Sequence, residues 1–206
     1  MVVPLALSAL VLLVAGCQRA DPGGRPEASP TVNVERSGLG MLLVAGDLGA
    51  GWLADDARPG LPPWPWEQDD CPDYRSSDYT AKSHRRSAVQ RYYRLPDGSS
   101  PAHHVVETYE PGWAARNVDD VRQVLRRCAS YLVHGSRVSF DIIDPHYLSD
   151  AGLLVRGRIA HADTPTTARY FVMVKRDETV STVSLPDLGN QAAVDTIAAK
   201  AVARLG

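Results

Sequence analysis

Three cysteines are the residues whose types and surroundings could do the most specific chemistry. Cys17 follows an uncharged stretch, residues 1–16, that ends in the small residues Ala15 and Gly16. Such a stretch is typical of a cleaved export signal, and its apolar residues are too few for the roughly 20 that a membrane-spanning helix needs. We therefore predict cleavage after Gly16 and lipid attachment to the thiol of Cys17.

The segment Leu13-Val14-Ala15-Gly16-Cys17 resembles the lipobox of bacterial lipoprotein signals. The resemblance implies acyl chains such as palmitate on Cys17, which anchor a protein because each buried methylene contributes about 0.8 kcal/mol. The alternative is an ordinary secretory signal with an accidental cysteine. We expect a signal peptide over 1–16, a lipidated cysteine and flexible Pro/Gly-rich tether over 17–38, and an extracytoplasmic domain over 39–206, held on the outer face of the cytoplasmic membrane.

The other two cysteines, Cys71 and Cys128, would lie in an oxidising compartment. Because Cys17 is used by the lipid, these two are expected to form a disulfide. Closing a loop of that length would stabilise the fold by about 4 kcal/mol in the chain-entropy model. The alternative, free thiols that share a metal or do redox chemistry, is disfavoured because the sequence has no CxxC pair.

Histidines and carboxylates offer only weak patterns for metal binding. In His103-His104-x-x-Glu107 the two histidines would point to opposite faces of a strand, which separates them as ligands. His161 and Asp163 could share a face, but one such pair at a strand end is more often a solvated turn. We expect no metal and no cofactor, and we find no hydrolase elbow, zinc-protease helix or phosphate loop.

Two features could instead bind a ligand. Arg156 and Arg158 would share one face of a strand, with Lys175 on a neighbour, and could present a cationic stripe to an anion. Trp64 and Trp66 lie in a proline-rich loop, residues 60–66, and could form the rim or lid of a binding site. The alternatives are that the cations only solvate an exposed sheet and that the tryptophans cap the edge of the core.

Hydrophobic periodicity predicts the elements that would position these residues. Alternation favours strands over 85–95, 102–109, 137–143, 153–161, 168–175 and 179–185, with a tight hairpin at Asp177-Glu178. Helical spacing predicts one helix with Asn117 as its N-cap and a second at the C-terminus. The apolar positions of the two helices are Val118, Val121, Leu125, Cys128 and Leu132, then Val194, Ile197, Ala201 and Leu205. The fold class is α+β, a single antiparallel sheet of about six strands packed against two main helices.

Several short motifs resemble actinobacterial lipoproteins related to the PknH-type extracellular sensor domain. They are Asp47-Leu48-x-x-Gly51-Trp52, Pro111-Gly112-Trp113-Ala114-Ala115, Arg127-Cys128-Ala129-Ser130-Tyr131 and Ile197-Ala198-x-Lys200-Ala201. The resemblance covers residues 42–205 and implies an antiparallel sheet packed against helices with a cleft between them. Members of that family typically carry two disulfides, whereas this domain can form one. The resemblance supplies no catalytic residues.

Composition fits one globular domain without a nucleic-acid partner. The chain of 206 residues has a net charge of −2 and is 44% hydrophobic, so no basic surface for nucleic acid is indicated. We expect a non-enzymatic, lipid-anchored ligand-binding or sensor domain that takes an amphiphilic or anionic envelope ligand. The alternatives are a module that docks a membrane or secreted protein through the Trp-rich loop, and an unrecognised envelope hydrolase.

Overall fold

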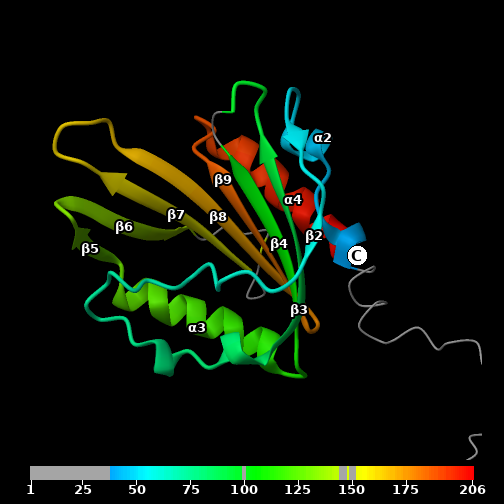
Figure 1. Ribbon diagram of the computed structural model, residues 1–206, viewed down its shortest axis with the longest axis horizontal. Helices are drawn as coiled ribbons and strands as arrows, with labels where there is room; N and C mark the ends of the chain where they lie inside the picture. The colour runs from blue at the N-terminus through cyan, green and yellow to red at the C-terminus, as the bar shows by residue number, and fades with distance from the viewer. Residues whose placement is uncertain (1–37, 99–100, 144–147, 149–151) are drawn as a thin grey trace, which may run out of the picture.

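The computed structural model describes residues 38–98, 101–143, 148 and 152–206, shown as a ribbon in Figure 1. The predicted signal peptide and the lipidation site Cys17 lie outside these residues, as does nearly all of the predicted tether. Within the described part of the chain, none of the helices is long and apolar enough to span a membrane.

One antiparallel sheet of nine strands organises the domain. Six of the strands were predicted from alternation, and each observed boundary lies within one residue of the expected one. They are β3 (Arg85–Arg94), β4 (Ala102–Tyr109), β6 (Ser136–Ile143), β7 (Gly152–Ala160), β8 (Thr167–Arg176) and β9 (Thr179–Pro186). The expectation of about six strands was too low, because three short strands were missed: β1 (Leu53–Ala54), β2 (Arg58–Pro59) and β5 (Ser130–Val133). Strands of two to four residues are too short to show an alternation.

The strand order is β1-β3-β4-β9-β8-β7-β6-β5, with β2 paired to β3. Strands β5 to β9 therefore form a meander, and the β3–β4 hairpin adds to its β9 side. The last turn, Asp177-Glu178, is the predicted tight hairpin: Arg176 pairs directly with Thr179, and Asp177 adopts a positive φ of 49°. Asp tolerates this conformation better than most residues do.

Two helices cover opposite faces of the sheet, α3 (Trp113–Arg127) and α4 (Gln191–Arg204), as Figure 1 shows. The α3 prediction needs two corrections. The helix begins with Gly112 as its N-cap, so Asn117 is an interior residue with a buried side chain. It ends at Cys128, and Leu132 lies on β5 with 63% of its surface exposed. The sequence did not show where α3 ends, because Leu132 on β5 continues the helical spacing of its apolar residues.

Each helix encloses its own hydrophobic core. The α4 side is packed with residues such as Leu154, Val172, Val183 and Ile197. The α3 side contains an aromatic core, which is made of Trp64, Trp66, Tyr74, Tyr79 and Tyr109 together with Val121, Leu125, Leu153, Val155 and Met173. Strand β7 supplies alternate residues to the two sides, as its sequence predicted.

The chain between β2 and β3 crosses α3 and contains two short 3-10 turns, η1 (Ser76–Asp78) and η2 (Ala81–His84). A short helix, α2 (Ala45–Leu48), precedes it. The predicted disulfide joins Cys71 of this crossing segment to Cys128 at the end of α3, with an S–S distance of 2.06 Å. Both cysteines are buried, so the bond lies inside the α3-side core.

Candidate functional site

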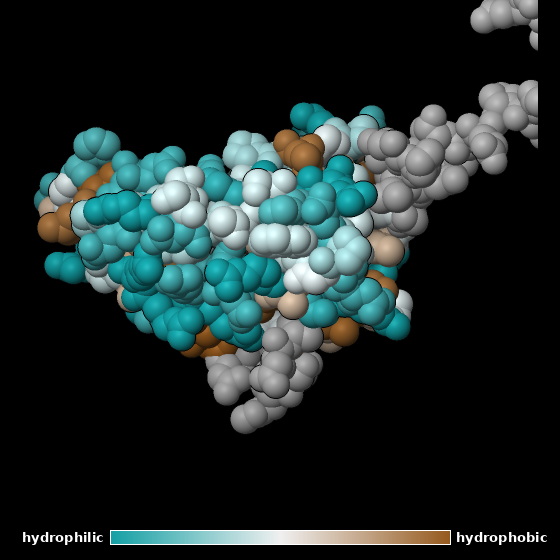
Figure 2. Space-filling model, turned by 90° about the horizontal axis from the view of Figure 1, so that it is seen from below, coloured by the Kyte–Doolittle hydropathy of each residue, from teal (hydrophilic) through white to brown (hydrophobic). Residues whose placement is uncertain are grey.

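A cleft of about 720 Å³ opens on the α3 side of the sheet, beyond the end that α3 covers. Its walls come from β5 to β9 and from Gln68 of the crossing segment. A volume of this size is in the range that holds small-molecule ligands in proteins. From below, on the side where α3 and the crossing segment lie in Figure 1, the molecule is mostly hydrophilic, with scattered hydrophobic areas (Figure 2).

The floor of the cleft is aromatic, and Gly157 makes room for it. Phe140 on β6 lies directly across from Gly157 on β7. A Cβ at position 157 would lie 3.2 Å from the Phe140 ring and 3.3 Å from the Phe171 ring. These contacts are tight, so the bare glycine backbone lets the two rings close over β7. Phe140, Gly157 and Phe171 therefore form an apolar floor.

One wall of the cleft is held by the disulfide. The hydroxyl of Tyr131 donates a hydrogen bond to Oε1 of Gln68 at 2.5 Å, and both residues line the cleft. Gln68 lies three residues before Cys71, and Tyr131 lies three residues after Cys128. The Cys71–Cys128 bond therefore joins the two segments that bring this pair together.

The polar end of the cleft is formed by Arg169 of β8. Its side chain is on the floor side of the sheet, because Arg169 pairs across strands with Gly157. The guanidinium donates to Oγ of Ser184 at 3.2 and 3.3 Å and to the carbonyl oxygen of Pro101 at 2.7 Å. Burial lowers the pKa of Arg169 from its usual value, although a guanidinium remains charged at any ordinary pH.

A histidine and an aromatic ring extend this polar end across the sheet. His103 on β4 pairs across strands with Ser184, stacks on Tyr92 with ring centroids 4.1 Å apart, and hydrogen-bonds Oε1 of Gln90 at 3.0 Å. Burial, and secondarily the charge of Arg169, lower the pKa of His103 to about 4. The imidazole is therefore neutral near pH 7, and Arg169 is the charged group at this end.

The predicted tryptophans belong to the α3-side core and do not line the cleft. Trp64 and Trp66 are each only 2% exposed, so they are packed as the core-capping alternative describes and neither forms an exposed rim or lid. Trp64 donates its indole N–H to Oδ1 of Asn117 at 3.0 Å. Trp66 packs on Phe171 with ring centroids 5.4 Å apart, which places it beside one of the two rings of the floor. Ligand contact by these two rings stays a prediction.

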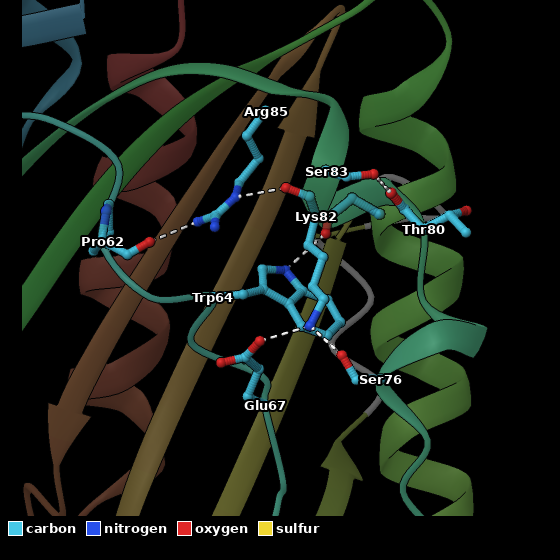
Figure 3. A network of polar contacts seen from close by, with 9 residues as sticks. Pro62, Trp64, Glu67, Ser76, Thr80, Lys82, Ser83 and Arg85 are labelled. Carbon is cyan, nitrogen blue, oxygen red and sulfur yellow. Dashed lines mark hydrogen bonds and ion pairs between the residues drawn. The ribbon is translucent and has the colours of Figure 1, made fainter. Parts of the chain in front are cut away.

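A polar network holds the loop around Trp64 in place (Figure 3). Nζ of Lys82 contacts Oε1 of Glu67 at 2.6 Å and Oγ of Ser76 at 2.7 Å. Arg85 donates to the carbonyl oxygens of Pro62 and Lys82 and pairs with the buried Glu107 at 2.9 Å. These contacts join parts of the crossing segment to one another and to β3 and β4, and so support the Gln68 wall.

The predicted cationic stripe is largely neutralised. Arg156 lies over the Tyr170 ring and pairs with Asp187 at 3.4 Å. Arg158 pairs with Asp141, and it borders the cleft. Lys175 does not join this stripe, because it pairs across strands with Val180 of the α3-side core, whereas Arg156 pairs with Tyr170 of the α4-side core. These arginines stay candidates for ligand contact, although Arg158 alternates with Gly157 along β7, so its side chain lies on the face opposite to Phe140 and Phe171.

The histidine pair is split between the two faces, as expected. His104 is fully buried on the α4 side, where Nδ1 accepts the N–H of Leu43 and Nε2 contacts Oγ of Ser181 at 2.8 Å. Glu107 accepts hydrogen bonds from Arg85 and from the hydroxyl of Tyr109. Among the described residues, no group of three His, Cys, Asp or Glu side chains is placed to hold a metal ion.

Sequence reasoning missed the residues that form the cleft, namely Gln68, Tyr131, Phe140, Phe171 and Arg169. The alternation of β8 places Arg169 and Phe171 on one face, which the sequence does show. What it does not show is that α3 leaves this part of the face uncovered.

The fold of this chain is similar to that of a known extracellular domain. The extracellular domain of PknH from Mycobacterium tuberculosis superposes with a TM-score of 0.63 at 16% identity, over 89% of this chain and 98% of that one. An uncharacterized protein of Mycobacterium smegmatis, an Rv0999 ortholog, gives a TM-score of 0.40 at 14% identity, over 76% of this chain and 90% of that one. No family model and no curated protein matches the sequence. The first likeness confirms, as a likeness of fold, the resemblance read from the sequence motifs.

Proposed function

We propose that this chain is a lipid-anchored, non-enzymatic domain on the outer face of the cytoplasmic membrane that binds an envelope ligand in the cleft. The observation that carries the proposal is the cleft itself, which combines an apolar floor at Phe140 and Phe171 with a polar end at Arg169. Ligand pockets typically have this composition, a mainly apolar lining with a few polar groups that orient the ligand.

Two further observations support the location and the absence of catalysis. The likeness of fold to an extracellular domain agrees with the export signal that the lipobox predicts. The described residues that line the cleft include no His, Ser or Cys, and the one carboxylate among them, Asp187, is engaged by Arg156 and by the N–H of Gly189. The lining is thus equipped to hold a ligand rather than to transfer a proton or form a covalent bond.

The rival proposal, docking of a partner through the Trp-rich loop, loses its main support. That proposal needs exposed tryptophan rings as anchors. Both rings are 2% exposed and belong to the core. The cleft is therefore the better candidate for recognition.

Native mass spectrometry of protein purified from its own membrane tests the proposed function. The wild-type chain should retain an added mass. Thr167→Trp should lose that mass, because Thr167 is exposed at the mouth of the cleft and a larger side chain there would fill it. Thr196→Trp, at an exposed position of α4 on the other side of the sheet, is the matched control and should retain it. A wild-type protein without added mass, or an equally loaded Thr167→Trp variant, would contradict the proposal.

A further inference from the structure

The charged groups around the cleft differ in how they are balanced. Arg158 is paired with Asp141, and Asp187 is paired with Arg156. Within residues 38–98, 101–143, 148 and 152–206, the hydrogen-bond partners of Arg169 are neutral, namely the hydroxyl of Ser184 and the carbonyl of Pro101. Among the described residues, no carboxylate lies within ion-pair distance of its guanidinium. The unbalanced charge at the cleft is therefore the positive charge of Arg169.

The Arg169 guanidinium has N–H donors that could bind an anion. A guanidinium has five N–H donors in a planar fork, and toward the residues that the structure describes Arg169 donates from Nε and Nη2 but not from Nη1. A charge that is partly removed from water is usually paired. An anionic oxygen in the cleft would accept hydrogen bonds from the N–H groups on Nη1 of Arg169. Such charge-assisted hydrogen bonds are stronger than those between neutral groups.

The apolar floor starts immediately beside this charge. Arg169 pairs across strands with Gly157, over which the rings of Phe140 and Phe171 close. His103, a titratable neighbour of Arg169, is neutral near pH 7 and adds no second positive charge. Among the described residues that line the cleft, Arg169 is thus the cation without an ion-pair partner, and it lies beside an apolar surface.

We propose that the ligand is an amphiphile with one anionic head group, which Arg169 binds, and an apolar body, which lies over Phe140, Gly157 and Phe171. This inference rests on the proposed function and specifies its ligand class. Carboxylate and phosphate head groups both fit, because an anionic oxygen of either group accepts charge-assisted hydrogen bonds from the N–H groups on Nη1. A fatty acid and a phosphate-bearing lipid are the two sources of that chemistry.

A series of amphiphiles with the same 12-carbon chain and different heads tests the inference. Laurate and dodecyl phosphate carry anionic heads, dodecyl maltoside a neutral one, and dodecyltrimethylammonium a cationic one. Binding is measured by titration calorimetry below the micelle concentration, on the full chain with Cys17→Ser so that no detergent is needed. Inorganic phosphate alone tests the head without the chain.

The two anionic amphiphiles should bind at least tenfold more tightly than the neutral and cationic ones, since a hydrogen bond to a charged group contributes about 1.5–3 kcal/mol. Arg169→Gln should abolish this preference. Arg176→Gln, which removes the same charge at an exposed end of the same strand away from the cleft, should keep it. Whichever anion binds more tightly identifies the source, carboxylate or phosphate.

Suppose that all four amphiphiles bind equally well and that Thr167→Trp abolishes this binding. This result would overturn the inference but leave the proposed function standing. A head-group preference that survives Arg169→Gln would also overturn it. If no member of the series binds, or if Thr167→Trp changes nothing, the cleft is not the ligand site and both proposals fall. If inorganic phosphate alone bound as tightly as dodecyl phosphate, the apolar floor would contribute nothing to binding, and the inference would be overturned.

Discussion

At the scale of the residue, the cleft and its support depend on a few side chains whose polar atoms are matched inside the protein. The indole N–H of Trp64, 2% exposed, is matched by Asn117, and the carboxylate of Glu107 by Arg85 and Tyr109. Matched groups of this kind are costly to alter one at a time, because the partner is then left buried without a hydrogen bond.

Replacing Trp64 tests its place in the core. Trp64→Ala should lower the free energy of unfolding by about 3–5 kcal/mol, the usual cost of deleting a buried aromatic ring. Trp64→Phe keeps much of the ring and loses only the hydrogen bond to Asn117, so its cost should be a smaller one, about 1–3 kcal/mol. Urea denaturation of the three proteins checks this order. A Trp64→Ala protein as stable as wild type would mean that the ring is not packed.

His104 should make the protein sensitive to acid. Burial, followed by the neighbouring charges of His103 and Arg91, lowers the pKa of His104 to about 3, whereas an unfolded histidine titrates near 6.5. Between these values only the unfolded chain binds the proton, so stability is complete above about pH 6.5 and falls as the pH drops. His103 adds an effect of the same sign over a narrower range, because its pKa is about 4.

The free energy of unfolding should therefore decrease by up to about 1.4 kcal/mol per pH unit for His104 between pH 6 and pH 4. Urea midpoints at several pH values measure this slope. His104→Gln should reduce the slope, whereas a glutamine in place of the exposed His134 should leave it unchanged. Equal slopes in wild type and His104→Gln would show that the buried imidazole is not the group responsible.

At the scale of the element, the long strands and both helices could be predicted because their apolar residues repeat over enough positions to show a clear period. Strand β4 was expected over 102–109 and is found there. The start of α3 was misplaced because its first turn follows Gly112 without a side-chain cap, so Asn117 looked like a better start. Strand β5 was missed because its four residues continue the helical spacing of the apolar positions in α3.

The disulfide is the element-scale feature with the largest expected effect. Cys71 and Cys128 are separated by 57 residues, and opening a loop of that length should cost about 4 kcal/mol in the chain-entropy model. The double variant Cys71→Ala, Cys128→Ala should therefore unfold at a clearly lower urea concentration than wild type. Intact-mass analysis gives a second check, since alkylation of these two thiols should require prior reduction. Alkylation without any reductant would contradict the bond.

At the scale of the whole molecule, the cleft joins segments that are far apart in the sequence, from Gln68 to Asp187. Sequence reasoning predicted a cleft between sheet and helices from the family resemblance, and it named arginines as anion ligands. It selected Arg156 and Arg158, which lie close together in sequence, and not Arg169. The difference between them is the pairing with Asp187 and Asp141, which depends on strand register across the sheet and is not visible in one strand.

The proposed lipid anchor is also a property of the whole protein, and the position of the protein in the cell tests it. Cys17→Ser should release the protein from the membrane fraction into the medium or leave an unprocessed precursor. Cell fractionation and gel mobility measure this outcome. The control is Cys71→Ala with Cys128→Ala, which removes the other two thiols and should leave the protein on the membrane. A Cys17→Ser protein that fractionates and migrates like wild type would refute lipidation.

The position of the disulfide beside the Gln68–Tyr131 wall has a consequence for when the protein can capture its ligand. The bond cannot persist in a reducing cytoplasm, where thiols are kept reduced. Under the proposed export, a newly made chain would therefore cross the membrane before the disulfide that holds this wall has formed. We expect ligand loading to follow export and oxidation, so that the protein samples molecules outside the membrane and carries none out from the cell interior.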